Sequence, residues 1–303
     1  MKQGKESETG LRIASGTGEE IRADVSDNTL KAYEHATRKL GSWLEGRALS
    51  DASLAEYVRF LHEQGKSAAT INLVVSAVKW MAEHHGIDPV AGAATERAAS
   101  AVRKKGKGRG RRQADGLTWD DVERVCAAAE SADTAAGMRD AAMISLMSDC
   151  LLRISEVVAV DVEDVGEEGL QMHSREGEQE ERGATLYICD STRRLIERYR
   201  RRTDVDSGAL FRRIRFQNHV TEDRLGVKGA REAIRRRAAE AGVEGVISGH
   251  SLRAGSAVSL AEAGASVREV QRAGRWRDAT MPARYVREAP EEHSPVERYK
   301  NGK

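Results

Sequence analysis

Cysteine, proline and aromatic residues are scarce in this sequence. Its 303 residues include three cysteines and four prolines, and aromatic residues make up 4% of the chain. Cys126, Cys150 and Cys189 lie far apart, are odd in number and form no CxxC pair. This pattern argues against a disulfide framework and against a zinc site. We expect the three thiols to be packed in the interior, as free cysteines usually are.

Long apolar segments and a charge imbalance are also missing. No run approaches the roughly 20 apolar residues that a membrane helix needs, and the polar residues 1–10 contain no signal-peptide core. These absences predict a cytoplasmic protein with no membrane partner. Because 49 basic residues face 48 acidic ones, for a net charge of +1, the overall charge gives no argument for a nucleic-acid partner. Any such argument must rest on local clusters.

The length predicts two domains. Residues 1–25 lack a sustained apolar period and are expected to form a flexible tail. Apolar residues then recur at helical spacing, first after an N-cap expected at Asp27 or Asn28, then over residues 54–65 and 71–86. Together these segments predict a small all-helical domain over residues 26–102.

A basic, glycine-rich segment follows at residues 103–115. It contains Lys104, Lys105 and Lys107 as well as several arginines. Such a segment is either a solvated connector, because its glycines make it flexible, or a strap along a phosphate backbone, where each neutralised phosphate contributes through counterion release. The chemistry of the residues that follow favours the strap.

Residues 116–290 predict a second domain that is mainly helical and contains a small sheet. Residues 169–174 and 184–189 are short candidates for extended strands on either side of a polar segment, and predict a hairpin. Residues 291–303 carry mixed charge and few apolar anchors, and form a C-terminal tail. Helical spacing is found from Thr118, over 139–152, and again over 191–202, 227–241, 251–263 and 267–274. The predicted fold class is mainly α, with an all-helical N-terminal domain and a mixed α+β second domain.

Two arginine pairs in the second domain suggest a phosphate site. Arg153 follows an apolar helix end, and Glu156 three residues later can hold its guanidinium, which is the side chain best suited to bidentate binding of phosphate. His250 and Arg253 have the same spacing at an expected helix start, where the positive end of the helix attracts an anion. Alone, the first pair also suits a solvated helix face, and the second suits an ordinary N-terminal helical turn.

Tyr285 is the candidate nucleophile. A phenol ordinarily has a pKa of about 10, so it attacks well at neutral pH only where cations and hydrogen bonds favour the phenolate. The two arginines would do so, and the indole N–H of Trp276 would donate to a phosphate oxygen. Tyr299, in the charged tail, is a rival nucleophile. A tyrosine among arginines and a histidine suggests chemistry on a phosphodiester.

The order of these motifs resembles one known family. Leu-Leu-Arg-Ile-Ser-Glu at 151–156, His-Ser-Leu-Arg-Ala-Gly at 250–255, Ala-Gly-Arg-Trp at 273–276 and Arg-Tyr-Val-Arg at 284–287 are similar to the motifs of the tyrosine recombinases, or phage integrases. The likeness is strongest to the Cre-like members, which carry Trp where many others carry His. It covers roughly residues 26–290, although the N-terminal part matches in pattern more than in identity.

The resemblance implies a site-specific recombinase that closes around double-stranded DNA as a clamp, with residues 103–115 bridging its two domains. Arg153 and Arg253 would bind the scissile phosphate, His250 would assist proton transfer, and Trp276 would contact a non-bridging oxygen. Tyr285 would form a 3′-phosphotyrosine, and Glu156 would support the site. Four identical protomers on two specific DNA sites would exchange strands through a Holliday junction, without metal, ATP or another cofactor, on the DNA of the nucleoid.

One departure concerns the acid that protonates the leaving 5′-hydroxyl. The family places a lysine in the hairpin turn, but this chain has no lysine between Lys107 and Lys228. Arg175 lies nearest to that place. Because an arginine hardly ever releases its proton, Arg175 would donate a hydrogen bond to the leaving oxygen but would act poorly as a general acid. We expect a slow or assembly-dependent enzyme.

The clamp analogy also gives candidate DNA contacts. Helices that begin near Thr29 and Thr70 would meet the grooves, with Lys31 and Lys79 as phosphate contacts, joined by Lys104, Lys105 and Lys107 of the basic segment. Phosphate contacts position a protein without specifying sequence. Two other functions stay open at this point: a catalytically weak protein that binds DNA and holds sites together, and an enzyme similar to type IB topoisomerases, which would relax supercoils as a monomer.

Overall fold

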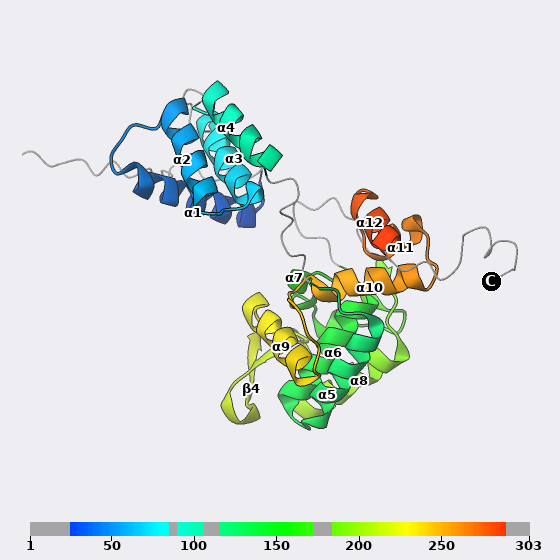
Figure 1. Cartoon of the computed structure of the whole chain (residues 1–303). Helices are drawn as coiled ribbons and strands as arrows, with labels where there is room; N and C mark the ends of the chain where they lie inside the picture. Colours follow the sequence, from blue (N-terminus) through cyan, green and yellow to red (C-terminus); the bar gives the residue numbers. More distant parts are fainter. Residues whose placement is uncertain (1–24, 85–89, 106–114, 173–183, 289–303) are drawn as a thin grey trace, which may run out of the picture. The chain divides into compact units, whose positions relative to one another are not determined.

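The computed structural model describes residues 25–84, 90–105, 115–172 and 184–288. The chain divides into two compact units, Met1–Arg111 and Arg112–Lys303, whose boundary falls within the basic segment (Figure 1). The described part is mainly helical with two small antiparallel sheets, which confirms the predicted fold class.

Four helices form the first unit, and their apolar faces enclose one core around Leu40, Leu54, Ile71 and Val78. The N-cap of the first helix is Ser26, whose hydroxyl accepts a hydrogen bond from the Thr29 amide, and not Asp27 or Asn28 as expected. Both of those residues lie inside the helix, so the expected start was one or two residues too late, because three capping-type residues stand in a row. The helices are α1 (Asp27–Leu44), α2 (Asp51–Glu63), α3 (Ala68–His84) and α4 (Ala93–Lys105).

The fourth helix was not expected, and it alters the predicted linker. Helix α4 continues to Lys105, so residues 103–105 are helical and the connector can begin only after them. Its start is fixed by Asp51, whose carboxylate accepts hydrogen bonds from the amides of Gly92, Ala94 and Thr95 at 2.9 Å each. These bonds lower the pKa of Asp51 from 3.8 to about 2, chiefly through Thr95 and Ala94. A carboxylate from α2 thus caps a helix more than 40 residues away.

The second unit is built around a larger helical core. Leu117, Met143, Leu152, Tyr199 and Phe211 are among its fully buried side chains. Helix α10 lies at one end of this core, and α11 and α12 pack on the side of α10 that faces away from the core (Figure 1). The helices are α5 (Trp119–Ser131), α6 (Ala135–Asp149), α7 (Ile154–Val157), α8 (Asp190–Thr203), α9 (Val227–Glu240), α10 (Ser251–Glu262), α11 (Val267–Ala273) and α12 (Thr280–Glu288), with 3₁₀ turns η2 (Val162–Asp164) and η3 (Phe216–Asn218).

Two antiparallel pairs of short strands complete this unit. Strands β1 (Leu170–Gln171) and β2 (Thr185–Leu186) pair Leu170 with Leu186, and they lie within the two segments predicted as a hairpin. Strands β3 (Arg212–Ile214) and β4 (Val220–Arg224) form a second pair that the sequence analysis missed. Its residues are rich in arginine and acidic side chains and show no strand-like alternation of apolar residues, so periodicity gave no signal.

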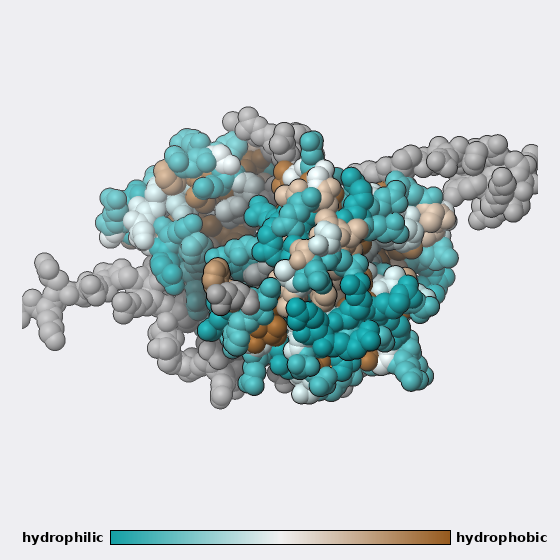
Figure 2. Space-filling model, turned by 90° about the horizontal axis from the view of Figure 1, so that it is seen from below, coloured by the Kyte–Doolittle hydropathy of each residue, from teal (hydrophilic) through white to brown (hydrophobic). Residues whose placement is uncertain are grey.

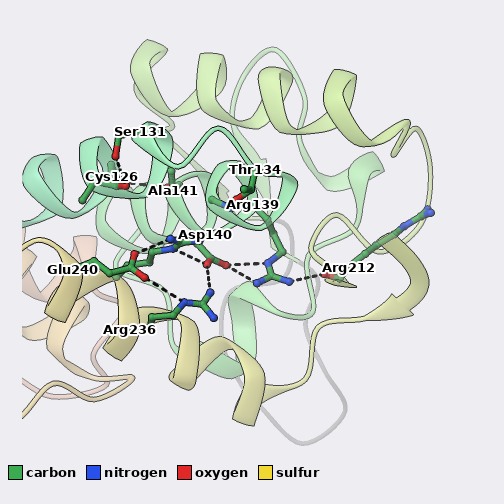
Figure 3. Close-up of polar contacts among 12 residues, drawn as sticks. Cys126, Ser131, Thr134, Arg139, Asp140, Ala141, Arg212, Arg236 and Glu240 are labelled. Carbon is green, nitrogen blue, oxygen red and sulfur yellow. Dashed lines mark hydrogen bonds and ion pairs between the residues drawn. The ribbon is translucent and has the colours of Figure 1, made fainter. Parts of the chain in front are cut away.

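A buried ionic cluster ties three elements of the second unit together (Figure 3). Asp140 of α6 is completely buried. Its carboxylate accepts bonds from Arg139 at 2.6 and 3.0 Å, from Arg236 at 2.8 Å and from Arg237 at 3.0 Å. Arg139 also donates to the carbonyl of Arg212 on β3. Because a buried carboxylate is tolerated only with such partners, the cluster fixes α9 and β3 against α6.

The exterior is strongly hydrophilic on the face that Figure 2 shows, with apolar residues in small scattered patches. This agrees with a charged fraction of 32%. Among the described residues, no helix is long and apolar enough to cross a membrane.

Candidate active site

Four segments from two distant parts of the sequence meet near the start of α10. They are the end of α6, the short helix α7, the first turn of α10, and the stretch from the end of α11 into α12. The polypeptide leaves α6 through a left-handed residue, Leu151, with φ of +47°. The Leu152 amide then donates to the Met147 carbonyl, which is the closing bond of a Schellman motif. This turn sends the chain directly into Arg153.

Arg153 and Glu156 form the first predicted pair. Arg153 is the N-cap of α7, so its backbone amide and its side chain face the same carboxylate. The amide donates to Glu156 Oε2 at 2.7 Å, and Nη1 donates to Oε1 at 2.6 Å. The Arg153 side chain is 35% exposed and that of Glu156 is 12% exposed. A fixed and accessible guanidinium is the arrangement that binding a phosphate requires.

Arg253 lies deeper, in the first turn of α10, and is 5% exposed. Its Nη1 donates to the Leu151 carbonyl at 2.6 Å, and its Nη2 donates to the Gly274 carbonyl. The guanidinium also lies over the ring of Trp276, with Cζ 4.3 Å from the centroid, in the range of a cation–π contact. Arg253 therefore joins the α6–α7 turn to the segment that carries Trp276.

Trp276 in turn contacts the predicted nucleophile. The ring centroids of Trp276 and Tyr285 are 5.7 Å apart at an interplanar angle of 48°. Tyr285 lies on α12 and is 7% exposed, within an apolar cluster that includes Leu151 and Val270. The close approach of the Trp276 ring explains Gly274, because a Cβ atom there would come within 1.8 Å of the ring.

Of the predicted catalytic residues that the structure describes, His250 is the one most open to solvent. It is exposed and stands at the N-cap of α10, with its backbone amide bonded to Ser248 Oγ at 3.2 Å. The helix begins at Ser251, where the sequence analysis placed the start of the segment 251–263. This arrangement places the histidine at the positive end of the same helix that carries Arg253.

Arg275 is a residue of this site that the sequence analysis missed. Its Nη2 donates to Glu156 Oε2 at 2.8 Å, and its Nη1 donates to the Cys150 carbonyl at 3.0 Å. The only available signal was its place beside Trp276. Its backbone is left-handed, with φ of +52°, which costs a non-glycine residue roughly 1–2 kcal/mol.

The cysteine thiols differ in their burial. Cys126 and Cys150 are buried, as predicted, whereas Cys189 is partly exposed at the N-cap of α8. Burial raises the pKa of Cys126 and of Cys150 to about 12, so both are protonated at neutral pH and unreactive. Within the described ranges there is no cluster of His, Cys, Asp and Glu side chains that would hold a metal ion.

Several predicted residues lie elsewhere. Arg175, Lys107 and Tyr299 fall outside the described residues. Lys31 is exposed on α1 and Lys104 on α4, and Lys105 ends α4. Lys79 bonds to Glu96 at 2.6 Å, so its charge is already matched within the first unit.

Comparisons with known proteins agree with this site. The phage integrase family matches residues 116–292, and the phage integrase N-terminal SAM-like domain matches residues 20–82. The first match spans more than half of the sequence, so the chain belongs to the phage integrase family. It is a tyrosine recombinase, an enzyme that transfers DNA strands.

Curated relatives and solved structures extend the likeness over both units. The tyrosine recombinase XerD of Listeria monocytogenes serotype 4b is 24% identical over 83% of this chain and 84% of its own length. The Cre recombinase of Escherichia phage P1 is 24% identical over 88% and 85%. A lambda integrase dimer bound to a COC′ core site has a TM-score of 0.63 at 16% identity, over 90% of this chain and 94% of that one, which shows a shared fold.

Proposed function

We propose that this enzyme cleaves and rejoins double-stranded DNA at a specific site through a covalent bond between Tyr285 and the 3′ phosphate of the broken strand. The observation that carries the proposal is the chain of contacts from Arg253 to Trp276 and from Trp276 to Tyr285, beside the Arg153–Glu156 pair. Residues of α7, of α10 and of the stretch from α11 into α12 thus belong to one network of contacts that includes the tyrosine.

In the proposed step, the phenol oxygen of Tyr285 attacks the scissile phosphorus and its proton passes to His250. The bond between phosphorus and the 5′ oxygen breaks, and this oxygen takes a proton from solvent while Arg175 donates a hydrogen bond to it. Attack by the 5′-hydroxyl of a partner strand then restores a phosphodiester and releases the tyrosine. The energy of the broken bond is kept in the covalent intermediate, so ATP and a metal ion are not needed.

The two arginines would have different parts in this step. Arg153 is accessible and already oriented by Glu156, so it would bind the phosphate on arrival. Arg253 is buried and bonded to two carbonyls, so it would reach the phosphate only after a rearrangement that also exposes Tyr285. Fixed cations stabilise the charge that develops on the phosphoryl oxygens. The need to uncover both groups fits a slow or assembly-dependent enzyme.

We further propose that four protomers act on two DNA sites and exchange strands through a Holliday junction. A lambda integrase tetramer bound to a Holliday junction has a TM-score of 0.62 to this chain at 15% identity, which supports this assembly by likeness of fold. Lys31, Lys104, Lys105 and Lys107 would then contact phosphates, and Lys79 would do so only after release from Glu96. Such an enzyme would work on the nucleoid, in the cytoplasm.

Covalent trapping tests the proposal. The protein and its Tyr285→Phe variant are incubated with nicked duplexes taken from DNA that flanks its coding region, and the products are separated on a denaturing gel. We expect a shifted protein–DNA band from the parent and none from the variant. Tyr187→Phe is the matched control, since this tyrosine is 71% exposed and lies outside the site, so its band should equal that of the parent.

Other outcomes would reassign the function. A band that survives in Tyr285→Phe but disappears in Tyr299→Phe would move the nucleophile to the tail. Specific DNA binding with no band from any protein would favour a protein that binds and holds DNA sites without cutting them. Relaxation of supercoiled plasmid without joining of two duplexes would favour a topoisomerase.

A further inference from the structure

Arg275 stands where the backbone favours another residue. Helix α11 ends in a Schellman motif, in which the Trp276 amide donates to the Gln271 carbonyl at 3.1 Å and the Arg275 amide donates to the Arg272 carbonyl at 3.1 Å. Position C′ of this motif, here Arg275, is usually glycine because it is left-handed. Glycine at this position would remove the backbone strain, so the presence of arginine must be explained by what its side chain does.

The burial of this side chain is equally unusual. Among the described residues, six non-glycine residues have positive φ, and all are exposed except Leu151 and Arg275, which both belong to the site. The Arg275 side chain is 12% exposed, and within the described part of the chain its buried Nε has no hydrogen-bond partner. An unsatisfied buried donor destabilises a fold. General stability therefore does not account for arginine at this position.

The contacts of Arg275 lead to the phosphate-binding arginine. Glu156 Oε2 accepts from the Arg153 amide at 2.7 Å and from Arg275 Nη2 at 2.8 Å, while Oε1 accepts from Arg153 Nη1 at 2.6 Å. The two arginines thus donate hydrogen bonds to the same carboxylate. Without Arg275, Arg153 and Glu156 would be a neutral pair. With it, the three side chains carry a net charge of +1.

We propose that Arg275 is a positioning residue of the recombination site. It fixes the Glu156 carboxylate and offsets part of its negative charge, so that Arg153 presents one orientation to the scissile phosphate. Its bond to the Cys150 carbonyl also holds the segment that carries Trp276 against the end of α6. This role rests on the proposed function, because it acts through Arg153 on the phosphate.

The test compares Arg275→Gly, Arg275→Met and Arg275→Lys in the full chain. The rate of covalent adduct formation on a nicked duplex should fall about ten- to hundredfold in the glycine and methionine variants, the range that loss of one charged hydrogen bond corresponds to. Lysine keeps the charge and should recover part of the rate. DNA affinity should change less than about twofold, since Arg275 is buried. Arg268→Met, which replaces an exposed arginine on α11, the helix that Arg275 follows, is the matched control.

A double-mutant cycle with Glu156→Gln separates positioning from a structural role. If Arg275 acts through Glu156, its replacement should slow cleavage far less in the Glu156→Gln background than in the parent. Arg275→Gly is decisive, because glycine closes the helix at least as well. Parental cleavage by this variant, or equal losses in both backgrounds, would overturn the proposal.

A second double-mutant cycle, measured by urea unfolding, does not require the enzyme to be active. Coupling between Arg275→Met and Glu156→Gln supports the fixing of the carboxylate, and its absence overturns the positioning role. If the parent itself forms no adduct, the proposed function fails, and this unfolding cycle still decides whether Arg275 holds Glu156.

Discussion

Gly255 allows the helix that carries Arg253 to pack directly on the backbone of another segment. A Cβ atom at this position would lie 1.8 Å from the Leu117 carbonyl oxygen and 2.1 Å from its carbon, about half of an ordinary contact distance. The Leu117 amide donates to the Ser251 carbonyl at 2.9 Å, so the neighbouring backbone is itself held in place. Gly255→Ala must therefore displace α10 or residues 115–118.

Two opposing terms set the size of the effect. Alanine is favoured over glycine inside a helix by up to about 1 kcal/mol, whereas overpacking of a close contact costs roughly 1–3 kcal/mol. Because the contact is with backbone and not with the end of a flexible side chain, we take the upper part of that range. The net loss is about 2 kcal/mol, which lowers the Tm of a unit of this size by roughly 4–8 °C.

Gly229→Ala is the matched control, as the same substitution in another helix. Its Cβ atom would meet Leu225 Cδ1 at 3.0 Å, the end of a flexible side chain. The helical preference for alanine then prevails, and the Tm should stay level or rise by about 2 °C. Thermal unfolding followed by circular dichroism compares the two variants, and covalent trapping should show slower adduct formation for Gly255→Ala alone. Equal melting temperatures in the two variants would refute the inferred close packing.

Asp140 and its arginines should differ sharply in their effect on stability. Asp140→Asn leaves three arginines around a neutral group and should cost about 3–5 kcal/mol in urea unfolding. Arg237→Met should cost roughly 2–3 kcal/mol and Arg236→Met less than about 1 kcal/mol, because their side chains are 6% and 52% exposed; equal costs would contradict the assigned network. Asp51 should make the first unit sensitive to acid: its folded pKa of about 2 lies below the usual 3.8, so its stabilising contribution is complete above about pH 4 and is lost as the pH falls towards 2. Asp51→Asn should flatten that part of the stability profile, and an unchanged profile would argue against the capping bonds.

The amino-acid sequence alone determined the class of enzyme and most of the helices. Helical periodicity is local, so it is readable from spacing, and the order of the motifs around Arg153, Arg253 and Tyr285 carries the family resemblance without any knowledge of the fold. The helices that the sequence analysis placed from residue 191 onward all have counterparts in α8 to α11. In contrast, α4 was missed, because its charged residues hide a narrow apolar face.

The tertiary structure decided how these residues are used. Spacing brought Arg153 to Glu156, but only the fold brings Arg275, which follows α11, to the same carboxylate 119 residues away in the chain. Burial of Arg253 and Tyr285 likewise depends on contacts between α10, α11 and α12. Such contacts join residues that are distant in sequence, so the spacing of residues along the chain does not reveal them. The chemistry can therefore be recognised in the sequence, whereas the positions and exposure of its groups follow from the fold.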